Sequence, residues 1–120
     1  MEKVKGIGGL FFRAKEPETL AAWYRDMLGI DLTPTDMETP PWISEEGVTV
    51  FAPFSADTEY FPPSQQMMVN FRVSDLKAML AQLHAGDVEP FNTSEMEGVG
   101  RFAHITDPEG NAIELWEPKN

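Results

Sequence analysis

Gly100-Arg-Phe-Ala-His-Ile-Thr-Asp-Pro-Glu-Gly-Asn-Ala-Ile-Glu-Leu-Trp116 is the stretch of sequence that decides the fold. It predicts a tight β-hairpin, because Pro108 presets the φ angle of the turn and Gly110 accepts the left-handed position. The arms on either side of this turn alternate apolar and polar residues, which is the pattern of half-buried strands.

The alternation gives the hairpin two different faces. If Asp107 lies opposite Asn111, one face carries two opposed pairs, His104 with Glu114 and Phe102 with Trp116. The other face is a plain packing surface of Ala103, Ile105, Ile113 and Leu115. We therefore expect the face with the histidine, the carboxylate and the two aromatic rings to form the wall of a pocket.

The rest of the chain repeats one order of elements twice. Residues 7–14 and 67–73 predict strands that share a Phe-Arg pair, and each strand leads into a helix, at about 17–28 and 75–85. Ser74 or Asp75 can cap the second helix, and a glycine follows each helix. The expected shorter strands are at about 30–32, 42–44 and 48–51 in the first half, and at about 88–91, 101–106 and 112–116 in the second half.

This order predicts a single α+β domain over residues 1–120, built from two β-α-β-β-β modules. The first module covers about residues 5–53, a proline-rich linker covers about 54–66, and the second module covers about 67–118. A module this short cannot bury both faces of its own sheet, so we expect the two modules to pack on each other or on a second chain.

Composition excludes several classes of function. The formal net charge of −11 and the isoelectric point near 4.4 argue against binding to nucleic acid or to anionic membranes. The absence of cysteine excludes a disulfide framework, a thiolate zinc site and a cysteine nucleophile. No apolar run approaches the ~20 residues of a membrane span, and the first residues do not lead into the apolar region of a signal peptide. We expect a cytoplasmic protein.

From about residue 5 to 118, the chain resembles the vicinal oxygen chelate superfamily, which includes glyoxalase I, bleomycin-resistance proteins, fosfomycin-resistance enzymes and extradiol dioxygenases. Three features carry the resemblance: the opening Phe11-Phe-Arg-Ala-Lys-Glu-Pro-Glu-Thr-Leu-Ala-Ala-Trp-Tyr-Arg-Asp-Met-Leu-Gly29, the doubled module, and the closing Asp107-Pro-Glu-Gly-Asn-Ala-Ile-Glu-Leu-Trp116. The resemblance implies a curved mixed sheet around a cavity, often within a homodimer.

Members of the superfamily that catalyse reactions commonly hold a divalent metal with side chains from four strands. The resemblance places those positions at Gly9, about Thr49, Met68 and Glu114. Among these, only Glu114 binds a hard or borderline cation well, and one carboxylate falls short of the ligands that a catalytic site supplies. We therefore expect no cofactor. The alternative is zinc, nickel, manganese or iron held by Glu114 together with His104.

Alternation along the strands assigns the remaining side chains to two faces. Those expected to face the helices are Leu10, Phe12, Val48, Val50, Val69, Phe71 and Val73. His104 and Glu114 are the candidate catalytic pair, with a buried polar pair that closes the hairpin as the alternative. The candidate ligand-binding residues are Phe11, Arg13, Trp42, Thr49, Phe51, Met68, Asn70, Arg72, Phe102 and Trp116. The aromatic residues in this set also suit a core between the modules, and the two arginines also suit ion pairs at the rim.

Two functions follow from these residues. The first is a binding protein whose pocket takes a small apolar, aromatic or cationic molecule without a metal. The second is a metal-dependent lyase, isomerase or dioxygenase-like enzyme that uses Glu114 with His104, and Glu114→Gln would abolish its turnover.

Overall fold

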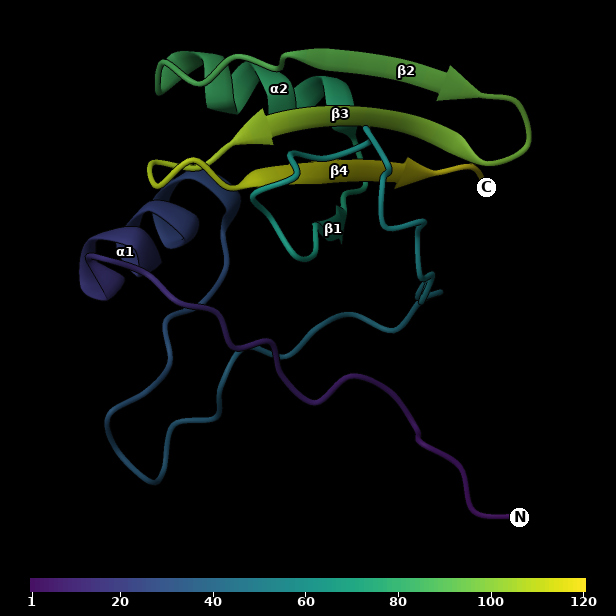
Figure 1. The fold of residues 1–120 in the computed structure, drawn as a ribbon. Helices are drawn as coiled ribbons and strands as arrows, with labels where there is room; N and C mark the ends of the chain where they lie inside the picture. The colour runs from purple at the N-terminus through teal and green to yellow at the C-terminus, as the bar shows by residue number, and fades with distance from the viewer.

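The computed structural model describes all 120 residues and has two helices and one open four-stranded sheet (Figure 1). In chain order the elements are α1 (Pro17–Leu28), β1 (Val69–Arg72), α2 (Leu76–Ala85), β2 (Asn92–Met96), β3 (Gly100–Thr106) and β4 (Ala112–Pro118). The strands lie in the order β1-β4-β3-β2, with β1 parallel to β4 and the other two pairs antiparallel. The α+β class predicted from the sequence is confirmed.

The register of the β3–β4 hairpin is the predicted one. His104 pairs with Glu114, and Phe102 pairs with Trp116. At the turn the backbone N–H of Asp107 donates to the carbonyl oxygen of Asn111 at 2.9 Å. Gly110 takes a φ of 86°, a left-handed conformation that a residue with a Cβ adopts only with strain.

The core lies between the helices and one face of this hairpin. Its most deeply buried side chains are Leu83 of α2 and Ile105, Ile113 and Leu115 of the hairpin. The apolar stripe of α1 packs against this cluster through Trp23, Tyr24, Met27 and Leu28. Phe71 and Val73 also face this core, as the alternation along 67–73 predicts.

The hairpin turn also ties α1 to the sheet. The carboxylate of Asp107 accepts hydrogen bonds from the backbone N–H groups of Glu109 and Asn111 and from the side-chain amide of Asn111. Its fourth donor is the hydroxyl of Tyr24 on α1, at 2.7 Å. Asp107 is only 4% exposed, so these bonds are the ones that satisfy a buried charge. Burial and the neighbouring Asp107 raise the pKa of Tyr24, which therefore stays a neutral donor.

Carboxylates accept hydrogen bonds from backbone N–H groups near the start of each helix. Glu109 accepts from the backbone N–H groups of Lys15 and Glu16, just before Pro17 begins α1. Glu117 at the end of β4 accepts from the N–H of Leu76, the first residue of α2. Asp75 caps α2 through the N–H of Ala78, which confirms one of the two predicted capping residues.

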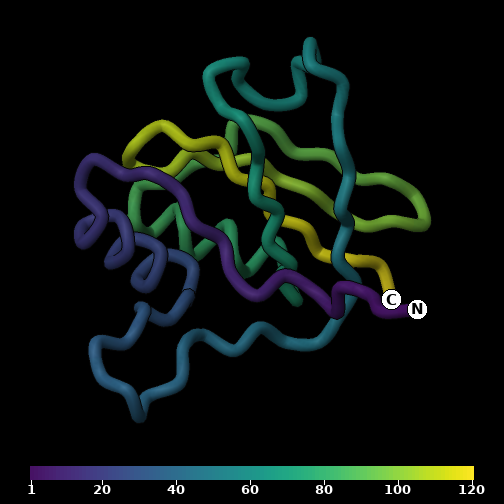
Figure 2. The backbone as a smooth tube through the Cα atoms, turned by 60° about the horizontal axis from the view of Figure 1, so that its bottom comes forward, coloured from purple at the N-terminus to yellow at the C-terminus, as the bar shows by residue number.

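The first half of the chain differs from the prediction. The segments 7–14, 30–32, 42–44 and 48–51 form no strand, so only the second module has its full set of elements. Figure 2 shows the chain before and after α1 as irregular, with residues 42–51 running far from that helix. Val48 and Val50, expected to face the helices, are 63% and 71% exposed. Leu10 is exposed too, and Phe12 is 53% exposed, with its ring edge-to-face on Tyr24 of α1.

Proline and the lack of a partner account for the missing strands. Of the chain's 10 prolines, six lie between residues 34 and 63 (34, 40, 41, 53, 62 and 63), where they remove backbone donors next to the expected strands. A strand also needs a neighbour to pair with, and within this chain no segment pairs with them. All but one of the 13 buried residues therefore lie between Leu76 and Trp116.

The second half departs from the prediction at one strand. The strand expected at about 88–91 lies instead at Asn92–Met96. Asp87 takes a positive φ of 64°, and Pro90 has no N–H to donate, so the ladder with β3 begins only at Phe91 and Asn92. Every residue of β2 is exposed, and such a strand has no apolar alternation by which it could be recognised.

We predict that Tyr24→Phe lowers the free energy of unfolding by about 1.5–3 kcal/mol, because Asp107 loses a donor in a buried site. Urea denaturation measures this difference. In an Asp107→Ala background the same substitution should cost much less, because the bond is already gone. Tyr60→Phe is the matched control: its hydroxyl does not contact Asp107, so its effect should be the same in both backgrounds. An equal cost of Tyr24→Phe in both backgrounds would contradict this account.

Candidate ligand-binding site

The sheet register brings three polar side chains together on the face opposite the helices. Asn70 of β1 pairs with Glu114 of β4, and Glu114 pairs in turn with His104 of β3. Paired residues on adjacent strands point to the same face, so the three side chains form a row across the middle of the sheet. This row contains both candidate catalytic residues and one of the candidate ligand-binding residues.

The carboxylate of Glu114 is the centre of this row. Its Oε1 accepts a hydrogen bond from the amide of Asn70 at 2.7 Å, and its Oε2 lies 2.8 Å from Nε2 of His104. The hydroxyl of Tyr60 also donates to Oε2. Glu114 is 6% exposed and His104 is 3% exposed. The carboxylate is thus held away from water by donors that the protein supplies, and no buried side-chain polar atom in the chain lacks a partner.

Tyr60 is a site residue that the sequence analysis did not single out. It comes from the segment 54–66, which the sequence predicts as a linker. Burial and the hydrogen bond to Glu114 raise the pKa of Tyr60 to about 12, so the phenol stays neutral at ordinary pH. One signal was available: Tyr60 and Phe61 are adjacent aromatic residues in front of Pro62-Pro63, in a stretch of small and polar residues.

An open hollow of about 500 Å³ lies beside this cluster. Residues 56–63 and Phe91 line it, so the acidic residues Asp57 and Glu59 border it together with the aromatic residues Tyr60, Phe61 and Phe91. Two of its aromatic residues also contact His104: Tyr60 lies edge-to-face on the imidazole at 5.0 Å, and Phe91 lies tilted to it at 5.6 Å. The buried acid–imidazole pair therefore lies directly behind an aromatic wall.

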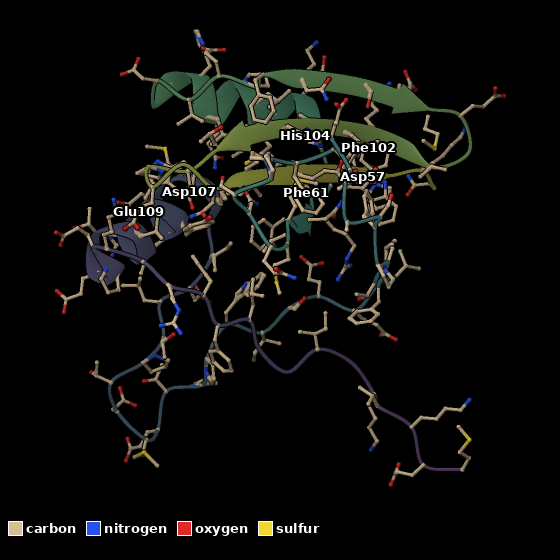
Figure 3. The ribbon with its side chains drawn as sticks, in the orientation of Figure 1. Asp57, Phe61, Phe102, His104, Asp107 and Glu109 are labelled. Carbon is tan, nitrogen blue, oxygen red and sulfur yellow. The ribbon has the colours of Figure 1, made fainter.

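Phe102 and Trp116 extend the same face of the sheet. Their rings are stacked, with centroids 5.9 Å apart and an interplanar angle of 3°. The indole N–H of Trp116 donates to the carbonyl oxygen of Val99 at 3.1 Å, which fixes the plane of the stack. Figure 3 shows Phe102 and His104 on β3 with Phe61 close to them in this view, while Asp107 and Glu109 lie at the turn beside α1.

The other predicted ligand-binding residues lie apart from the Glu114 cluster. Arg72 donates instead to the carbonyl oxygens of Glu45 and Glu46, at 2.9 and 3.5 Å. Trp42 packs edge-to-face on Phe71, which faces the core on the other side of the sheet. Met68 is half-buried just before β1, and four residues of the first half are exposed in irregular chain: Phe11, Arg13, Thr49 and Phe51.

The side chains present do not fit a metal site of the expected kind. No group of three or more His, Cys, Asp or Glu side chains in the chain lies close enough to hold a metal ion. Of the positions that the resemblance implies, Gly9 and Thr49 are exposed, Met68 is a thioether, and both oxygens of Glu114 already accept hydrogen bonds. Hard and borderline cations need more oxygen or nitrogen ligands than this cluster offers.

Neither helix of the chain has the length and apolar character of a membrane-spanning segment.

Comparison with known proteins gives matches in both sequence and structure. A family model described as "Glyoxalase-like domain" matches residues 9–116. An antibiotic binding protein from Streptomyces sp. CB03234, TnmS3, is 26% identical, with a TM-score of 0.56 and 88% of each chain covered. A glyoxylase/bleomycin resistance protein/dioxygenase domain from Frankia sp. EAN1pec is 14% identical, with a TM-score of 0.63 over 98% of this chain and 100% of the other.

A third solved structure, lactoylglutathione lyase from Agrobacterium tumefaciens, is 15% identical, with a TM-score of 0.60 over 96% of this chain and 95% of the other. No curated protein matches the chain in sequence. The family model spans most of the chain, and the solved structures share its fold. The chain therefore belongs to the glyoxalase-like domain family of the vicinal oxygen chelate superfamily.

Proposed function

We propose that this protein binds a small apolar, aromatic or cationic molecule on the open face of its sheet and that it does so without a metal. The observation that carries the proposal is the hollow of about 500 Å³ whose lining includes Tyr60, Phe61 and Phe91, two of which contact His104 of the buried Glu114–His104 pair. A volume in this range suits a small organic ligand, and aromatic walls with a few fixed polar groups are typical of such sites. The net charge of −11 would also favour a cationic ligand.

The relatives support binding as the general activity. TnmS3, the antibiotic binding protein, covers 88% of this chain at 26% identity. A second Streptomyces protein, described as a glyoxalase/bleomycin resistance protein, is 25% identical over 87% of this chain. Metal independence is supported by the donor set around Glu114, because the groups that fill its oxygens are an amide, an imidazole and a phenol of the protein itself.

An enzyme is the second candidate, and one contact favours it. Nε2 of His104 lies 2.8 Å from Oε2 of Glu114 in a buried setting, which suits an acid–base pair. The same contact also serves as a structural pair at the centre of the sheet. Cytoplasmic location stays a prediction from the sequence.

We predict saturable binding of naphthalene or of the benzyltrimethylammonium ion, measured by calorimetry and by quenching of tryptophan fluorescence. Treatment with EDTA should leave the affinity unchanged. Phe91→Ala removes one wall of the hollow and should weaken binding at least tenfold. Met37→Ala is the control, because Met37 is a fully exposed apolar side chain outside the hollow. Binding that chelation abolishes, or that Phe91→Ala leaves intact, would contradict the proposal.

We predict that high pH releases the segment 54–64 from the sheet. The pKa of Tyr60 is raised in the folded protein from 10.0 to about 12, so its hydrogen bond to Glu114 stabilises this segment fully below pH 10 and is lost as the pH rises through about 12. In Tyr24→Phe, Tyr60 is the sole remaining tyrosine, and absorbance at 295 nm follows its ionisation. A midpoint near that of the urea-unfolded control would contradict the placement of Tyr60 on Glu114.

We also propose that two copies associate through the open first half of the chain. The accessible surface is 9804 Å², whereas a compact monomer of this mass exposes about 6,500 Å². Large apolar side chains contribute to this additional accessible surface: Phe11 is 96% exposed and Phe51 is 87% exposed. Exposed apolar surface of this extent is a common sign of a protein interface.

Sedimentation equilibrium should therefore give about 27 kDa, twice the 13.5 kDa of the chain. The double substitution Phe11→Glu with Phe51→Glu should shift the mass to that of a monomer, because it places charges in an apolar interface. A monomeric wild-type protein would refute the dimer and leave ligand binding within one chain untouched.

A further inference from the structure

Tyr60 holds the segment 54–64 to the sheet. Within this segment the other hydrogen bonds are local turns, such as Thr58 to Ser55, and the Tyr60 hydroxyl alone hydrogen-bonds to the sheet. The next attachment is Gln65, whose side-chain amide both donates to and accepts from the backbone of Ala112. Gln65 therefore fixes one end of the segment, and the contact at Tyr60 holds the rest of it in place.

The Tyr60 side chain makes the contacts that a small aromatic ligand would make at this site: its ring packs on other rings and its hydroxyl donates a hydrogen bond. Its ring lies edge-to-face on His104 at 5.0 Å and tilted against Phe54 at 5.5 Å. Its hydroxyl donates to a carboxylate that is 6% exposed, whereas Tyr60 itself is 42% exposed. The receiving group is thus built into the sheet, and the group it receives belongs to an exposed loop that can leave without disturbing the core.

At the position that the Tyr60 side chain occupies, the polar contact is the carboxylate of Glu114, and this contact suits a neutral hydroxyl donor. Asn70 and His104 already occupy two hydrogen-bonding positions of Glu114, and the phenol of Tyr60 occupies a third. Once Tyr60 leaves, Glu114 Oε2 has room for one directed donor next to an imidazole edge. A hydroxyl on a flat ring supplies both the donor and the edge-to-face contact.

We propose that the ligand of this site is a phenol, which takes the place of Tyr60 on Glu114 when the segment 54–64 moves away. This inference rests on the proposed function and adds the chemical class of the ligand. Phe91, which lies outside the segment 54–64 and contacts His104, then remains beside the ligand.

The test compares 4-methylphenol, 4-methylanisole and 4-methylbenzylamine as probes, titrated by calorimetry into Tyr60→Ala. This variant lacks the side chain that fills the position beside Glu114 and His104. We expect 4-methylphenol to bind at least tenfold more tightly than the other two probes. The anisole lacks a donor for the buried carboxylate, and the ammonium of the benzylamine has three N–H donors where Glu114 has room for one, so the others would be buried unpaired. In the double variant Tyr60→Ala with Glu114→Gln the acceptor is uncharged. There the affinity for 4-methylphenol should exceed that for the other two probes by no more than about threefold.

Each other result overturns the inference in a distinguishable way. Equal binding of phenol and anisole would remove the phenol class and leave aromatic binding intact. Tighter binding of the amine would assign the site to cations. No binding of any probe to folded Tyr60→Ala, together with unchanged naphthalene binding, would place the ligand site away from Glu114.

A second measurement on the wild-type protein covers the case in which Tyr60→Ala does not fold. With ¹³C at the ζ carbon of tyrosine, saturating 4-methylphenol should move the Tyr60 signal to the position of solvent-exposed tyrosine, while the Tyr24 signal stays fixed as an internal control. A Tyr60 signal that does not move at saturation would refute the exchange.

Discussion

The antiparallel pairing of β3 with β4 determines both faces of this molecule at once. Because side chains alternate, a register that places Ile105 and Leu115 against the helices must place His104 beside Glu114 on the other face. A slip by one residue would bury the polar pair among the helices and expose the core. The packing energy of the core therefore holds the polar cluster in position, although the two sets of side chains do not touch.

Two buried carboxylates complete the hairpin and serve different purposes. Asp107 at the turn collects four donors and joins the sheet to α1, so its role is structural. Glu114 in the middle of β4 accepts hydrogen bonds from two neighbouring strands and from the segment 54–64, which the Tyr60 hydroxyl alone hydrogen-bonds to the sheet. A buried charge whose last donor comes from an exposed loop is well placed for binding, because exchanging that donor for a ligand leaves the core unchanged.

The sequence predicts the helices and the closing hairpin well and the strands of the first half poorly, for physical reasons. The hairpin register, both helices and the capping Asp75 depend on local chemistry and on short-range pairing. The segments 7–14 and 48–51 have strand-like alternation, but alternation cannot supply a partner strand. Tyr60 lies 54 residues from Glu114 in sequence. A contact between residues this far apart cannot be predicted from the spacing of apolar residues, because the proline-rich loop that carries Tyr60 has no regular spacing. The pattern does not predict the strand at Asn92–Met96, because all of its residues are exposed and it has no apolar face.

The central claim is that donors of the protein, rather than a metal ion, satisfy the buried carboxylate of Glu114. A crystal structure of untagged protein grown with zinc, with anomalous data at the zinc edge, tests it most directly. The account predicts Tyr60, Asn70 and His104 on Glu114 and no anomalous peak at bonding distance from its oxygens. A zinc peak about 2.0–2.2 Å from Glu114, with Tyr60 displaced, would contradict it.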